Sequence, residues 1–86
     1  MHEEAMLRDL VRKAEEVARR EPAGRVTRVR IWVGALSHLA GPELEARWAH
    51  AVHGTALEGA RVDIEVSSDR ADPKAESVML RSLDVG

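Results

Sequence analysis

The segment from residue 4 to residue 20 carries an apolar stripe at helical spacing, and this stripe limits how the chain can fold. Charged residues fill the other side of this segment. The apolar residues recur every three or four positions and are Leu7, Leu10, Val11, Ala14, Val17 and Ala18. An amphipathic helix must bury such a stripe against another element. Because the chain has 86 residues, it has room for one small core. We therefore expect a single domain over residues 1–86.

Three later segments alternate apolar and polar residues, which predicts strands with one buried face. They cover residues 26–33, 60–66 and about 77–85. In the second segment Val62, Ile64 and Val66 are expected to face inward. The third segment changes phase, and a bulge near Arg81–Ser82 would return its apolar residues to the core side.

A second helix is predicted from Pro42, since proline suits the first helical position. Its expected apolar stripe is Leu44, Trp48, Ala51 and Val52, and Gly54 is a natural left-handed stop. The predicted fold is α/β, of the two-layer α+β kind. Two helices pack on one face of a three-stranded sheet, in the order α-β-α-β-β. On the open face, Arg28 and Arg30 can meet Asp63 and Glu65 if their strands pair.

Composition excludes several classes of function. The chain has no cysteine, so disulfides, thiolate catalysis and cysteine-ligated zinc are absent from it. A net charge of −2 gives no overall basic field for nucleic acid or anionic lipid. No apolar run is long enough to span a membrane, and the first residues do not resemble a secretory signal, so we expect a cytoplasmic protein. Catalytic motifs are also missing, and we expect no enzyme activity.

The first three residues, Met1, His2 and Glu3, form the most distinctive candidate site. The Met1 amine, the His2 amide nitrogen and the His2 imidazole can close two fused chelate rings around one metal ion. Such nitrogen donors favour square-planar Ni²⁺ or Cu²⁺, with Glu3 supplying the fourth ligand. The simpler interpretation is an ordinary helix start, where acidic residues are favourable and a histidine lies at a frayed end.

The other histidines give weaker indications. His38, in the loop before the second helix, is a candidate outer ligand if that loop folds near the N-terminus, and otherwise a solvated loop residue. His50 and His53 are three residues apart on the predicted helix, which lets two imidazoles share a metal. No carboxylate is spaced with them, so ordinary surface histidines are the favoured interpretation.

A candidate partner surface lies on the open face of the predicted sheet. Arg28, Arg30 and Trp32 share one side of the first strand. Trp32 could contact a partner there, or the arginine stems could cover it.

Several of these residues together resemble the HypA/HybF family. The similarity begins with Met1-His2-Glu3 opening a helix and continues through residues 26–37. It then runs over Pro42-Glu43-Leu44 and Trp48, Gly54-Thr55 and residues 58–60, and returns at residues 82–85. It spans residues 1–66 and about 77–86.

This resemblance implies a nickel metallochaperone for the maturation of hydrogenase and, in some organisms, urease. It implies Ni²⁺ at Met1, His2 and Glu3, with a nickel-handling GTPase and the hydrogenase large-subunit precursor as partners. The family also carries a zinc domain between its second and third strands. Here residues 67–75 form a short polar turn, as neighbouring antiparallel strands would allow, so no zinc is expected.

Two functions follow from these observations. The leading hypothesis is a nickel-binding accessory protein for a nickel enzyme. The alternative is a metal-free protein-interaction module of the same fold, which binds a partner or a second copy of itself through the sheet face or an exposed sheet edge. Homo-oligomer formation, the affinity for the metal and the identity of the client enzyme are left open by the sequence.

Overall fold

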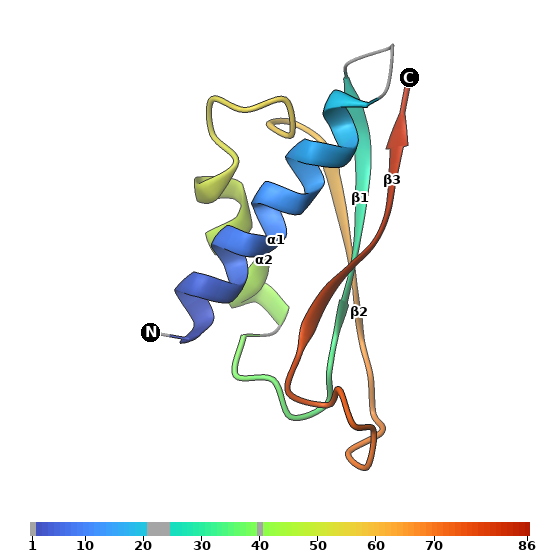
Figure 1. Ribbon diagram of the computed structural model, residues 1–86. Coiled ribbons are helices and arrows are strands. Elements are labelled where there is room, and N and C mark those ends of the chain that lie inside the picture. The colour runs from blue at the N-terminus through green and yellow to red at the C-terminus, as the bar shows by residue number, and fades with distance from the viewer. Residues whose placement is uncertain (1, 21–24, 40) are drawn as a thin grey trace.

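The computed structural model describes residues 2–20, 25–39 and 41–86, and at residues 2 and 3 it describes the backbone alone. Two helices lie on one side of a three-stranded sheet (Figure 1). The elements in chain order are α1 (His2–Arg19), β1 (Val26–Val33), α2 (Gly41–Ala51), β2 (Arg61–Val66) and β3 (Val78–Val85). The predicted α+β architecture and the order α-β-α-β-β are confirmed.

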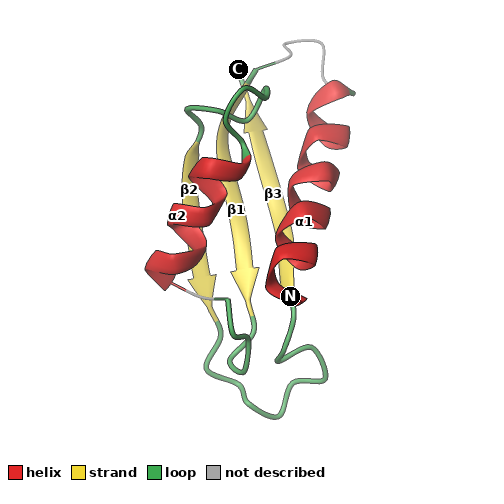
Figure 2. Ribbon diagram, turned by 90° about the vertical axis from the view of Figure 1, so that its left-hand side faces the viewer, coloured by secondary structure: helices red, strands yellow, loops and turns green. Residues whose placement is uncertain are grey.

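The sheet has the strand order β2-β1-β3, with β1 in the centre. β1 is parallel to β2 and antiparallel to β3. The expectation that β2 and β3 are neighbours is therefore wrong, because β1 lies between them. The segment 67–77 passes the end of β1, where Ser67 N donates to Val33 O (2.8 Å) and Gly34 N donates to Ser77 O (2.8 Å). Figure 2 shows α2 over β2 and β1, and α1 over β3.

The phase change in β3 is a bulge, as predicted. Arg30 lies opposite Ser82 and Ile31 lies opposite Leu80, which leaves Arg81 as the extra residue. The bulge lets four apolar residues of β3 pack against the core: Val78, Leu80, Leu83 and Val85. A strict alternation would have turned two of them toward solvent.

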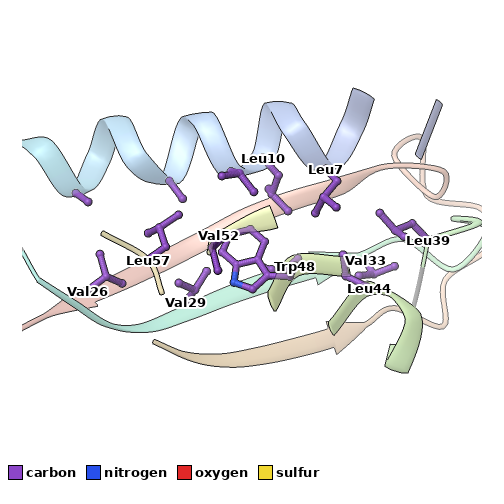
Figure 3. Close-up of a cluster of buried hydrophobic side chains, with 14 residues drawn as sticks. Leu7, Leu10, Val26, Val29, Val33, Leu39, Leu44, Trp48, Val52 and Leu57 are labelled. Atoms are coloured by element: carbon purple, nitrogen blue, oxygen red, sulfur yellow. The ribbon is translucent and has the colours of Figure 1, made fainter. Parts of the chain in front are cut away.

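The core lies between the helices and the sheet (Figure 3). Its largest fully buried side chains include Trp48, Ile31, Leu39, Leu44 and Leu57. Two of the residues expected in the core are exposed. Ala51 faces the groove between α1 and α2, since the buried row runs through Leu44 and Trp48 of α2 and Val52 directly after it. Val66, the last residue of an edge strand, is 54% exposed because it has a strand neighbour on one side only.

Candidate metal centre

The candidate metal ligands lie where α1 begins. The helix starts at His2, while Met1 and the side chains of His2 and Glu3 lie outside the described residues. The first four N–H groups of an α-helix have no acceptor within the helix. The amide nitrogens of His2 and Glu3 belong to this set, so a metal could take either one without breaking a helical hydrogen bond.

The loop between β1 and α2 lies at the same end of the molecule as the start of α1 (Figures 1 and 2). His38 is exposed on this loop. Its neighbours are fixed, since Leu39 is buried and its amide donates to Ser37 Oγ (3.2 Å). Leu36 N also donates to Ala75 O (2.7 Å). The anchored loop therefore presents the His38 imidazole to solvent at the end of the molecule where α1 begins.

His50 and His53 do not share a helix, because α2 ends at Ala51. His53 instead follows α2, and its Nδ1 lies 2.5 Å from Glu58 Oε2. The other carboxylate oxygen of Glu58 accepts from Gly54 N (3.3 Å). The expectation that no carboxylate accompanies these histidines was therefore wrong. The turn at Gly54, where φ is 82°, reverses the chain and brings residue 58 back to residue 53.

The open face of the sheet carries ion pairs where a partner surface was predicted. Arg28 Nε lies 3.0 Å from Asp63 Oδ2, and Arg30 Nη1 lies 3.3 Å from Asp84 Oδ1. Trp32 is 7% exposed and is buried apart from the main core cluster. The two arginines are thus neutralised and the indole offers little surface. The cross-strand attraction between Arg28 and Asp63 is as predicted, whereas Arg30 pairs with β3 instead of β2.

Two general properties concern the described residues only. Among the side chains of residues 4–20, 25–39 and 41–86, no group of three or more histidine or acidic side chains is close enough to hold a metal. Neither helix, over the residues described, is long and apolar enough to cross a bilayer.

The fold defines a class: small α+β domains in which two helices cover one face of a three-stranded mixed sheet. A family model for "Hydrogenase/urease nickel incorporation, metallochaperone, hypA" matches residues 1–74. The chain belongs to this HypA family.

Three curated relatives are each called hydrogenase maturation factor HypA. The chain is 33% identical to the one from Methylocella silvestris over 66 residues, which cover 77% of this chain and 58% of the relative. It is 35% identical to that of Polaromonas naphthalenivorans (83% of this chain, 62% of the relative). It is 37% identical to that of Chlorobium limicola (76% of this chain, 56% of the relative). The matched region thus spans about three fifths of each relative's length.

Proposed function

We propose that this chain is a nickel-binding accessory protein, a metallochaperone, that acts in the cytoplasm during the maturation of a nickel enzyme. Hydrogenase is the client that the names of the relatives favour. The chain acts as a carrier and not as an enzyme. The observation that carries this proposal is membership of a family described by nickel incorporation, in a chain that opens with Met1-His2-Glu3.

The proposed ligands of Ni²⁺ are the Met1 α-amine, the His2 amide nitrogen and imidazole, and Glu3. A helix that starts at His2 supports this set, because its first amides have no helical acceptor to lose. The helix dipole disfavours a cation at this end. Glu3, Glu4 and the loss of the amide proton offset that effect. Since the ligands bind in their deprotonated forms, nickel affinity rises with pH.

A site at a helix start suits a carrier. Ligands at a chain end can be exchanged one at a time for those of an acceptor protein. We propose a nickel-handling GTPase and the hydrogenase large-subunit precursor as the exchange partners. His38, from the anchored loop at the same end of the molecule, is the proposed outer ligand.

We further propose that residues 1–86 form one nickel-binding-type domain, with residues 67–75 in the place of the zinc domain that the family resemblance implies. Support comes from the hydrogen bonds that close this segment. Asp69 Oδ1 accepts from Ala71 N (3.0 Å), Asp72 Oδ1 accepts from Lys74 N (2.8 Å), and Ala75 N donates to Asp72 O (2.9 Å). These local bonds let the segment pass from β2 to β3 without an inserted domain. The chain itself then carries nickel and no zinc.

Native mass spectrometry of a chain that starts at Met1 tests the proposal. With Ni²⁺ present, we expect one metal ion per chain. A matched chain with two extra residues before Met1 should take up much less, because its α-amine is no longer beside His2. A stable oligomer of the untagged chain without metal uptake would instead support the metal-free interaction module.

A further inference from the structure

The loop of residues 34–39, between β1 and α2, lies next to the start of α1. Figures 1 and 2 show this arrangement from two directions, and the two views agree. His38 is exposed on this loop, and the residue that follows it, Leu39, is 1% exposed. The two neighbouring side chains thus have different surroundings, since the imidazole meets solvent near the proposed nickel ligands and the leucine lies in the core.

The Leu39 side chain packs at the end of the core where α1 begins. It belongs to the same buried cluster as Leu7 of α1. Figure 3 shows Leu39 and Leu7 at one end of this cluster, with Val26 and Leu57 at the other. Leu7 follows His2 by five residues, which is about 7.5 Å along a helix. One buried leucine therefore packs the loop against the part of the core that supports the first turns of α1.

Hydrogen bonds hold the main chain on both sides of His38. Ser37 Oγ accepts from Leu39 N (3.2 Å) and donates to Leu39 O (3.2 Å). Ser37 N donates in turn to Gly34 O (3.1 Å). The backbone that carries His38 therefore cannot shift without breaking these bonds or moving Leu39 out of the core.

Leu57 provides a comparison that separates position from stability. It is also a leucine outside the helices and strands, and it is 0% exposed. Truncation of either side chain to alanine removes the same atoms from the core, so both changes should weaken the fold. Only Leu39 adjoins His38, while Leu57 lies at the opposite end of the core (Figure 3). A difference in nickel binding between the two variants would therefore come from the position of Leu39.

We infer that Leu39 is a positioning residue of the nickel site. Its buried side chain holds the loop so that the His38 imidazole stays within reach of an ion bound at the start of α1. Leu39 itself does not contact the metal. An imidazole that is already held in place loses less freedom when it binds, so a fixed loop raises the affinity for nickel. This inference rests on the proposed function, with His38 as the outer ligand.

The affinity of the full untagged chain for Ni²⁺, measured in competition with a chelating dye, tests the inference. His38→Ala should weaken nickel binding about tenfold, and Leu39→Ala about threefold to tenfold, since it frees the same imidazole. The double variant should bind no more weakly than His38→Ala, because both changes remove one contribution. Leu39→Met keeps the side-chain volume and should bind normally. Leu57→Ala should lose stability and keep its affinity for nickel.

Ser37→Ala provides a second test that leaves the core intact, in case Leu39→Ala does not fold. It removes both hydrogen bonds to the Leu39 main chain and should weaken nickel binding about threefold, and only when His38 is present.

Three results would overturn the inference alone. They are an unchanged affinity in His38→Ala, effects of His38→Ala and Leu39→Ala or Ser37→Ala that multiply in the double variant, and equal weakening by Leu39→Ala and Leu57→Ala. Failure of the proposed function looks different: the wild-type chain would bind no nickel, or His2→Ala would bind it unchanged, and the inference would fall with it.

Discussion

Arg28 on β1 and Asp63 on β2 join the two parallel strands across the open face of the sheet, with Arg28 Nε 3.0 Å from Asp63 Oδ2. Both side chains are about one third to two fifths exposed, at 34% and 41%. In a double-mutant cycle with Arg28→Met and Asp63→Asn, we expect a coupling free energy of about 0.3–1 kcal/mol. Urea unfolding at low and high salt measures it, and the coupling should shrink at 1 M NaCl. A coupling that salt leaves unchanged would contradict a solvent-exposed ion pair.

Among the glycines, we expect Gly34 to tolerate substitution least, because an added Cβ would clash with the backbone of Ala75. A Cβ placed there would lie 2.2 Å from the Ala75 carbonyl oxygen, which is backbone and cannot rotate away. Gly34→Ala should therefore lower the free energy of unfolding by about 2–4 kcal/mol. Gly54→Ala meets no atom within 4 Å but has a φ of 82°, so we expect a smaller loss of about 1 kcal/mol. Chemical denaturation of both variants compares them, and equal losses would argue against the contact with Ala75.

Leu57 shows how the chain between α2 and β2 contributes to the core. It is fully buried, at 0% exposed, although it lies outside any helix or strand. Leu57→Ala should cost about 2–5 kcal/mol, which is a large part of the stability of a domain this small. Ala56→Gly, at the exposed neighbouring position, serves as the control and should cost less than about 1 kcal/mol. Thermal unfolding followed by circular dichroism measures both, and a minor effect of Leu57→Ala would show that this segment is not packed as described.

Asp9 should make stability depend on pH in the acid range. Hydrogen bonds from Lys13 and Arg12 hold the pKa of its carboxyl below the usual value of 3.8. The folded state therefore favours the ionised form, and this stabilisation is present above the unfolded pKa and lost as pH falls through the lower folded pKa. Asp9→Asn should reduce the urea midpoint slightly at pH 7 and not at pH 2. A difference between the two proteins that persists at pH 2 would contradict this origin.

Local patterns in the sequence were enough to predict most of the fold. The bounds of β1 and the bulge at Arg81 follow from alternation within single segments, and the structure confirms both. The strand order could not be read in this way. A turn of the length of residues 67–75 can join neighbouring strands or pass the end of a third, and the choice depends on how α2 places β2 beside β1.

Contacts between residues far apart in the sequence, or across a reversal of the chain, could also not be predicted from the sequence. Arg30 was expected to meet β2, yet its partner is Asp84, 54 residues away on β3. Glu58 reaches His53 because the chain turns back at Gly54, where φ is 82°, and spacing alone did not show this turn. For the metal site the sequence predicts Met1, His2 and Glu3, and these remain a prediction.

A titration of the untagged chain with Ni²⁺ near neutral pH, followed by visible absorption, tests the central claim most directly. Square-planar nickel with nitrogen donors gives a yellow band, and we expect it to saturate at one metal ion per chain. His2→Ala should abolish the band, whereas His53→Ala, which alters an exposed histidine paired with Glu58, should leave it intact. An unchanged titration in the His2→Ala protein would contradict the proposed nickel site.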